Sequence, residues 1–368
     1  MGTEAFPGRL GLQQRVLPRY RVEFFDALAE ACRGGLSVFA GQPRPQEAIE
    51  TADSLQEARL APGHNLHLLI GRAYLCAQPG LLHWLANWDP AALVVEANPR
   101  YLTTPAAIRW MHRRRRWVVG WGLGAPAVSG PLASLRQAAR RRFLRQFDAL
   151  LTYSQQGAEE YHAAGFAPER VFVAPNAATR RPAFPLPARP AGFQTRPTVL
   201  FVGRLQARKR VDLLLQACAR LPANLQPHVC IVGDGPARAE LEALARSVYP
   251  LAEFTGARHG PDLEPFYLAA DLFVLPGTGG LAVQQAMAHG LPVVVAEADG
   301  TQQDLVRPTN GWEITPGSPE ALQTILCTAL SDAGRLRRMG AVSYHIVAEE
   351  INIEAMVKAF LEALRVKL

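Results

Sequence analysis

Two basic residues, Arg204 and Lys209, stand five positions apart in the segment GRLQARK, residues 203–209. The segment follows TVLFVG, a short apolar run typical of a parallel strand that is buried on both faces. A helical pattern comes next, so both side chains are expected on a loop at the carboxyl edge of a sheet. A guanidinium fork and a mobile ammonium group together suit a pyrophosphate. The alternative for this motif taken alone is a solvated basic turn.

A second pattern that could bind an anion lies in GTGGLAVQQAMAHGLPVVVAE, residues 277–297. A glycine-rich turn follows the apolar run DLFVLP and leads into a short helix, expected to reach His289 and to end at Gly290. Free N–H groups at a helix start attract anions, and glycine lets the backbone approach a ligand closely. The alternative is an ordinary βα turn. The residues expected to contribute backbone groups are Gly279, Gly280, Leu281 and Ala282.

A carboxylate that could act as a general base, Glu96, ends another apolar run in VVEANPRYL. It can accept a proton from an acceptor hydroxyl if the two groups lie within about 2.6–3.2 Å of each other. The alternative is a structural ion pair between Glu96 and a neighbouring arginine. We interpret His162 and His289 as residues near helix ends.

The elements that must position these residues alternate between short strands and helices, which predicts an α/β protein with doubly wound parallel sheets. The pattern is clear in the second half of the chain and noisier in the first, where LHLLIG (66–71) is one of the expected strands. Between the halves, RRPAFPLPARPAGFQTRP (180–197) contains five prolines and no apolar periodicity, as expected of a linker. We therefore predict two Rossmann-like domains that face each other across a cleft. The expected bounds are 1–185 for the first domain, 186–197 for the linker, 198–345 for the second domain, and 346–368 for a final helix that packs back on the first domain.

Composition excludes a disordered chain, a collagen-like repeat and a small disulfide-rich scaffold. The chain has 368 residues, of which 49% are hydrophobic and 19% charged, so it can bury a large core without disulfides or metals. No apolar run approaches the roughly 18–20 residues that span a bilayer, and the first residues do not resemble a signal peptide. Five cysteines without a CxxC pair predict reduced thiols, and we expect a cytoplasmic protein.

Positive charge is concentrated in the first half. Residues 1–185 contain 22 Arg, no Lys and 14 acidic residues, whereas residues 186–368 carry a net charge of −1. The stretches RRRRW (113–117) and RQAARRRFLRQF (136–147) predict contact with an anionic membrane surface at the inner face. The alternative for the second stretch is a solvated face over a buried stripe of Leu135, Phe143, Leu144 and Phe147. Nucleic-acid binding is not favoured, because no recognition motif or aromatic platform accompanies the arginines.

Several motifs in order over residues 148–345 resemble the family 4 glycosyltransferases, also called group 1. They are DALLTYSQQGAEEYHAAGF, GRLQARKRVDLLLQA, IVGDGP, FTGARHGPDLEPFYLAADLFVLPG and QAMAHGLPVVVAEADGTQQDLV. The resemblance implies a GT-B fold and transfer of a sugar from a nucleotide donor, usually with retention at the anomeric carbon. It assigns Arg204 and Lys209 to the donor pyrophosphate. Such cations usually replace a metal, so we expect no metal and no cofactor beyond the donor itself.

The chain departs from that family at two places. The family carries two glutamates separated by seven residues, which contact the donor sugar and the ribose; here those positions are Gly277 and Gln285. Gln285 can still hydrogen-bond ribose hydroxyls, whereas Gly277 has no side chain. Leu123 stands where relatives often have a histidine. Backbone groups near Gly256 and Arg258 are expected to read the base.

The sequence thus predicts a hexosyltransferase that uses a UDP- or GDP-sugar and a sugar or lipid-linked acceptor, in cell-surface polysaccharide or glycolipid synthesis. Glu96, Arg204 and Lys209 are the expected catalytic residues. One alternative is a GT-B protein that binds a nucleotide sugar as a partner or regulator without efficient transfer. Another is an epimerase of sugar nucleotides.

Overall fold

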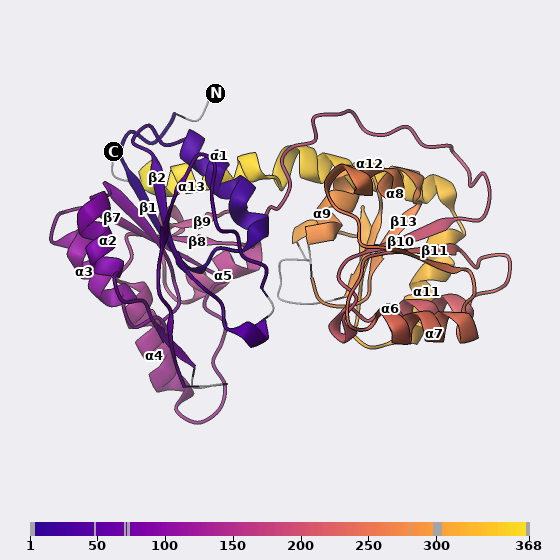
Figure 1. Ribbon diagram of the computed structural model, residues 1–368, viewed down its shortest axis with the longest axis horizontal. Helices are drawn as coiled ribbons and strands as arrows, with labels where there is room; N and C mark the ends of the chain where they lie inside the picture. The colour runs from indigo at the N-terminus through magenta and orange to yellow at the C-terminus, as the bar shows by residue number, and fades with distance from the viewer. Residues whose placement is uncertain are drawn as a thin grey trace. The chain divides into compact units, whose positions relative to one another are not determined.

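The computed structural model describes residues 4–47, 49–69, 71, 74–279, 281–296 and 304–365. The chain forms two compact units (Figure 1). Unit 1 comprises Met1–Ala178 and Ile353–Leu368, and unit 2 comprises Thr179–Asn352. The chain therefore leaves unit 1 after Ala178 and returns to it after Asn352.

Unit 1 is built on a seven-stranded parallel sheet of order β3-β2-β1-β6-β7-β8-β9. The strands are β1 (Leu10–Val16), β2 (Leu36–Gly41), β3 (Arg59–Pro62), β6 (Ala92–Glu96), β7 (Trp117–Gly122), β8 (Ala149–Thr152) and β9 (Val171–Val173). The helices are α1 (Val22–Glu30), α2 (Leu81–Trp88), α3 (Thr104–His112), α4 (Ala133–Leu144), α5 (Gln155–Ala163) and α13 (Ile353–Arg365). Central strands such as β6 are almost entirely buried, which explains their continuous apolar runs.

The last helix of the chain, α13, packs in unit 1. Its ring Phe360 is fully buried, with centroids 5.0 Å from Phe24 of α1 and 4.9 Å from Trp121 of β7. Trp117 donates a hydrogen bond from Nε1 to Ala363 O at 2.9 Å. The apolar face of α13 thus completes a core that α1 and the sheet leave open.

One segment that was predicted as a strand of the main sheet, LHLLIG, lies elsewhere. Leu66–Leu68 do not join the main sheet: as β4 they pair antiparallel with β5 (Leu75–Ala77) in a separate two-stranded sheet. Leu66 and Leu68 are more than 40% exposed, so this apolar run is not the signature of a buried strand. The edge of the main sheet is instead formed by β3, whose Pro62 is tolerated because an edge strand leaves some N–H positions unpaired.

Unit 2 has a six-stranded parallel sheet of order β12-β11-β10-β13-β14-β15. The strands are β10 (Thr198–Val202), β11 (His228–Val232), β12 (Ala252–Gly256), β13 (Leu272–Leu275), β14 (Val293–Ala296) and β15 (Gly311–Ile314). The helices are α6 (Val211–Ala219), α7 (Arg238–Val248), α8 (Glu264–Ala269), α9 (Leu281–Ala288), α11 (Pro319–Leu330) and α12 (Ala333–His345). Because β10 and β13 are neighbours, the loops that follow them lie at the same sheet edge.

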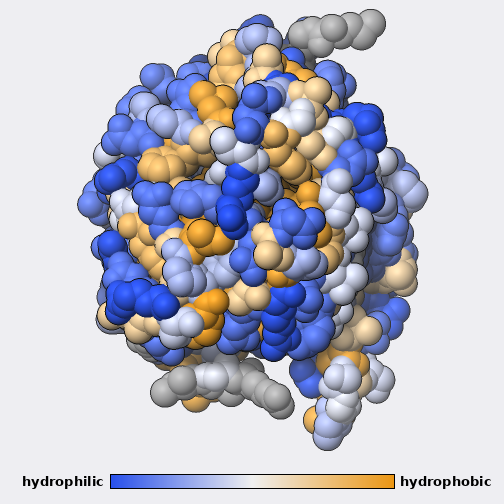
Figure 2. All heavy atoms as spheres, turned by 90° about the vertical axis from the view of Figure 1, so that its right-hand side faces the viewer, coloured by the Kyte–Doolittle hydropathy of each residue, from blue (hydrophilic) through white to orange (hydrophobic). Residues whose placement is uncertain are grey.

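Figure 2 shows hydrophilic and hydrophobic residues interspersed on one face of the molecule. Among the residues that the structure describes, no helix has the length and apolarity needed to cross a bilayer. The five cysteines are free thiols, and all except Cys327 are buried.

Candidate functional site

Two loops at the carboxyl edge of the unit 2 sheet are joined by hydrogen bonds. The first follows β10 and contains the short 3-10 helix η5 (Ala207–Lys209); the second follows β13 and contains the glycine-rich turn. Thr278 donates its backbone N–H to Arg208 O at 3.1 Å, and Lys209 donates from Nζ to Thr278 O at 2.6 Å. The structure thus brings Lys209 to the turn that precedes α9.

Two glycines make this close approach possible. A Cβ atom on Gly277 would lie 2.5 Å from the carbonyl carbon of Lys209 and would also collide with Arg208 O. Gly279 has φ +133°, and a Cβ there would collide with Lys209 Nζ. Packing therefore explains why position 277 is a glycine: the backbone after β10 fills the space that a side chain would need.

The loop after β10 carries Arg204, Arg208 and Lys209, and the hydrogen bonds that the described residues offer to Arg208 and Lys209 come from neutral groups. Burial, followed by the nearby Arg208 guanidinium, lowers the pKa of Lys209 to about 8. Arg208 donates to Gln206 Oε1 at 2.9 Å, and Arg204 is exposed. Within the described part of the chain, no carboxylate forms an ion pair with any of the three. Arg208 was not among the predicted site residues, although it lies in the same motif.

The helix α9 begins directly beyond the glycine-rich turn, at Leu281. Gly280 lies outside the described residues. Leu281 is 39% exposed and Ala282 is half-buried. The first N–H groups of an α-helix have no partner within the helix, so this end of α9 can bind an anion together with Lys209.

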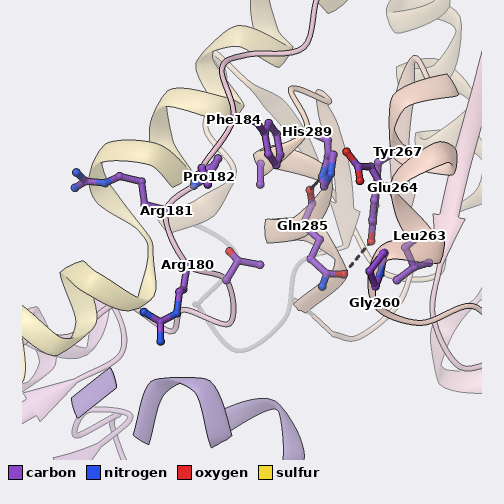
Figure 3. A pocket seen from close by; sticks show the side chains of 14 residues that line it. Arg180, Arg181, Pro182, Phe184, Gly260, Leu263, Glu264, Tyr267, Gln285 and His289 are labelled. Atoms are coloured by element: carbon purple, nitrogen blue, oxygen red, sulfur yellow. Dashed lines mark hydrogen bonds between the residues drawn. The ribbon is translucent and has the colours of Figure 1, made fainter. Parts of the chain in front are cut away.

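Gln285 lies one turn further along α9, beside a pocket of about 360 Å³ (Figure 3). Its side-chain oxygen accepts a hydrogen bond from Tyr267 OH at 3.1 Å. His289 donates from Nδ1 to the Gln285 carbonyl oxygen at 2.7 Å and stacks on Tyr267 with centroids 4.9 Å apart. Burial lowers the pKa of His289, which favours the neutral ring. The other pocket walls are residues 179–184, Gly260, Pro261, Leu263, Glu264 and Ala288.

The predicted base-reading segment follows β12. The Gly256 carbonyl accepts a hydrogen bond from Gly233 N–H at 2.9 Å, so that oxygen is already engaged by protein. Arg258 is exposed, and its guanidinium contacts Ala257 O at 3.4 Å. This segment can therefore offer a ligand the side chain of Arg258 and those backbone groups of residues 256–258 other than the Gly256 carbonyl.

Glu96 ends β6 in unit 1 and is half-buried. Its Oε2 accepts the backbone N–H of Arg15 at 2.7 Å. The Arg15 guanidinium instead pairs with Glu47 at 2.8 Å, so the alternative of a structural ion pair between Glu96 and that arginine is not what forms. Burial raises the pKa of Glu96 to about 7, against the opposing effect of Arg15. A carboxyl group with this pKa can exchange a proton near neutral pH.

Sequence reasoning missed a buried amide network next to Glu96. Gln13 accepts the Glu96 N–H at 3.2 Å and donates to the Gln78 side chain. Gln78 donates to Asn65 Oδ1 at 2.9 Å, and Asn65 donates to Arg15 O at 2.7 Å. The sequence signal for such a network was the pair Gln13 and Gln14 within the apolar segment that forms β1, because buried polar side chains need hydrogen-bond partners.

Two protein-family models together match most of this chain. A model described as "Glycosyl transferase 4-like domain" matches residues 18–177, and one described as "Glycosyl transferases group 1" matches residues 196–332. The chain belongs to the group 1 glycosyl transferases. Its two parallel-sheet units form the GT-B fold found in this family.

Curated relatives match over part of their length. The sulfoquinovosyl transferase SQD2 of Arabidopsis thaliana is 35% identical over 147 residues, which are 38% of this chain and 28% of the relative. A GDP-mannose-dependent alpha-mannosyltransferase of Mycobacterium tuberculosis is 43% identical over 116 residues, which are 31% of this chain and 28% of the relative. The match therefore spans little more than a quarter of these two relatives.

Solved structures match over nearly the whole chain. The lipopolysaccharide outer core galactosyltransferase WaaB has a TM-score of 0.68 and 16% identity, covering 98% of this chain and 100% of that protein. HepE of Anabaena, solved in complex with UDP, has a TM-score of 0.67 and 18% identity, covering 97% and 99%. At these identities the likeness establishes the fold.

Proposed function

We propose that this protein transfers a sugar, of the hexose type, from a UDP- or GDP-linked donor to an acceptor hydroxyl. The observation that carries the proposal is the position of Lys209: its ammonium group lies 2.6 Å from Thr278 O, directly before α9, on a loop that also carries Arg204 and Arg208. A diphosphate would supply the negative charge that the described protein groups do not. The solved complexes of HepE with UDP and with UDP-glucose support a donor of this class.

The proposed mechanism is electrostatic. As the bond from sugar to diphosphate breaks, negative charge develops on the leaving group, and Arg204, Lys209 and the α9 N–H groups of Leu281 and Ala282 stabilise it. Donors fixed in place act without reorganisation, so the proposal requires neither a metal nor a cofactor beyond the nucleotide sugar. Retention at the anomeric carbon is the expectation that the family resemblance supplies.

The remaining donor contacts are proposed from the pocket beside α9. Gln285 lies at its wall with an amide that can bind ribose hydroxyls, and the segment from Gly256 to Arg258 would contact the base. The GDP-mannose dependence of one relative and the UDP complexes of HepE leave both bases as candidates.

For the acceptor we propose a sugar or a lipid-linked sugar, used in cell-surface polysaccharide or glycolipid synthesis, in the cytoplasm or at the inner membrane face. Relatives named for lipopolysaccharide core synthesis support this class. Glu96 is the proposed proton acceptor, because its pKa of about 7 lets the carboxylate form near neutral pH.

The decisive experiment is calorimetric titration of the protein with UDP and GDP. Lys209→Ala is expected to weaken binding of the preferred nucleotide by about 10–150-fold, equivalent to the loss of one charge-assisted hydrogen bond. Lys358→Ala is the matched control, because Lys358 is exposed on α13, where it pairs with Glu362. Unchanged affinity in Lys209→Ala would remove the diphosphate assignment.

A second candidate is a nucleotide-sugar-binding protein that transfers poorly. Position 277 has no room for a side chain, which favours this candidate. The family resemblance also implies a histidine at the place of Leu123, which is 60% exposed here. Donor turnover that disappears in Arg204→Ala would favour the enzyme, whereas tight nucleotide binding without turnover would favour the binding protein. Conversion of the donor without an acceptor would instead indicate an epimerase.

A further inference from the structure

Two arginines of unit 1 converge on one carboxylate, that of Glu47. Arg15 lies near the end of β1, and Arg44 and Glu47 lie in the segment after β2. Arg15 donates from Nη1 to Glu47 Oε2 at 2.8 Å, and Arg44 donates to Glu47 Oε1 from Nη2 at 2.9 Å and from Nε at 3.2 Å. Because β1 and β2 are parallel neighbours, these side chains meet at the carboxyl edge of the sheet, where α/β proteins bind ligands.

The charges of these three residues do not cancel. Burial opposes ionisation of Glu47, but hydrogen bonds from Arg15 and Arg44 lower its pKa to about 2, so the carboxylate is charged at neutral pH. Among the described residues, no second carboxylate forms an ion pair with either arginine. Burial, and next the charge of Arg15, lower the pKa of the adjacent His67, as expected where the local field stays positive. An anionic ligand would supply the missing negative charge.

Both guanidinium groups are held in place and remain partly open to solvent. The Arg44 guanidinium carbon lies 4.7 Å from the ring centroid of Tyr74, whose hydroxyl is hydrogen-bonded to His67 Nδ1 at 2.9 Å. The Arg15 and Arg44 side chains are 14% and 24% exposed. In the part of the chain that the structure describes, Nε and Nη2 of Arg15 and Nη1 of Arg44 have no hydrogen-bond partner. These nitrogens are donors that a ligand can use.

The two arginines also lie next to the proposed proton acceptor. The backbone N–H of Arg15 donates to Glu96 Oε2 at 2.7 Å. The positive charge of Arg15 favours the ionised form of Glu96, against the larger effect of burial. A group bound by the guanidinium of Arg15 would therefore lie close to the carboxyl group that is proposed to accept a proton from the acceptor.

We propose that Arg15 and Arg44 form a subsite for an oxyanion, a phosphate or carboxylate group, carried by the acceptor sugar. Planar guanidinium groups match the oxygens of both kinds of anion, and Glu47 orients the two guanidinium groups. If the three residues only tied the segment after β2 to β1, one partly buried positive charge would lack a counter-charge, which is unfavourable. Naming the acceptor as the carrier of the anion rests on the proposed function, whereas the oxyanion subsite itself does not.

Calorimetric titration of the full chain with glucose-6-phosphate, glucuronate and glucose tests the subsite. At least one of the two anionic sugars is expected to bind about tenfold or more tightly than glucose, and the tighter one identifies the preferred oxyanion. Arg44→Gln and Arg15→Gln should each weaken binding of that sugar about tenfold, equivalent to the loss of one charge-assisted hydrogen bond. Circular dichroism checks that both variants fold, and Arg44→Gln serves alone if Arg15→Gln does not.

Arg19→Gln is the matched control for charge. Arg19 lies in the same unit, is 69% exposed and pairs with Glu50 at 2.8 Å, so its loss should weaken binding by about twofold at most. Lys209→Ala should bind the anionic sugar like the unmodified protein, because Lys209 belongs to unit 2. A protein that fails to bind UDP but binds the anionic sugar through Arg44 would remove the proposed function and keep this subsite.

Three results would overturn the proposal. The first is glucose that binds as tightly as both anionic sugars. The second is a folded Arg44→Gln protein that binds them like the unmodified protein. The third is an Arg19→Gln or Lys209→Ala protein that loses as much affinity as Arg44→Gln, since the attraction would then not be specific to this pair of arginines.

Discussion

At the scale of single residues, the candidate donor site is defined by cations for which the described part of the chain supplies no carboxylate partner. Lys209 donates a hydrogen bond to a neutral carbonyl oxygen, and burial beside Arg208 lowers its pKa to about 8. A bound diphosphate would reverse this effect, since an opposite charge favours the ammonium form. Binding and protonation are therefore coupled at this residue.

This coupling predicts the pH dependence of nucleotide binding. The free protein loses the Lys209 charge as pH rises through about 8, so UDP affinity should be constant below that pH and fall above it. Near pH 8, binding should take up a proton, which calorimetry detects by comparing buffers of different protonation enthalpy. Lys209→Met should bind weakly and without this step. An affinity that stays flat between about pH 7 and 9 would contradict the assignment.

At the scale of elements, the sequence predicted the strands with continuous apolar runs, did not predict β3, β9 or β15, and placed LHLLIG in the wrong sheet. The runs that became β6, β10 and β13 are apolar because helices or loops cover both faces, and that pattern is local. Whether LHLLIG is buried depends on which segments pack over it, and the spacing of apolar residues carries no information about that. In the structure Leu66 is exposed, and β3 forms the edge of the main sheet instead. The pair of glutamines in β1 indicated that buried polar partners were needed, but the partners come from three separate segments, so the network itself could not be predicted.

Gly277 is a second case in which the sequence pattern does not reveal how a position is packed. The family resemblance implies a glutamate at this position, whereas the structure shows that the backbone of Arg208 and Lys209 fills the space of a side chain there. Gly277→Ala should therefore destabilise unit 2 by about 1–3 kcal/mol through overpacking and should also weaken nucleotide binding, because it displaces Lys209. Chemical denaturation and UDP titration measure the two effects.

Gly192→Ala is the control for that substitution. A Cβ at position 192 would meet no atom within 4 Å, so its stability should match that of the unmodified protein. If Gly277→Ala is as stable as Gly192→Ala and binds UDP normally, the close contact between the two loops is not a feature of the protein in solution.

At the scale of the whole molecule, the chain returns to unit 1 only through α13, which begins at Ile353. The helix has a strongly one-sided pattern in IEAMVKAFLEAL, and its buried face meets α1 and the sheet through Phe360 and Met356. The core of unit 1 therefore depends on two segments that are far apart in the sequence, whereas unit 2 is formed by one continuous segment.

This organisation predicts that a single α13 substitution affects one unit alone. Phe360→Ala removes a fully buried ring packed on Phe24 and Trp121, and it should destabilise unit 1 by about 3–5 kcal/mol. In scanning calorimetry the transition of unit 1 should move to lower temperature, and the transition of unit 2, identified because saturating UDP raises it, should stay in place. Lys358→Ala, on the exposed face of the same helix, should change neither transition. A Phe360→Ala protein in which the UDP-sensitive transition moves as far as the other would show that the two units do not unfold independently.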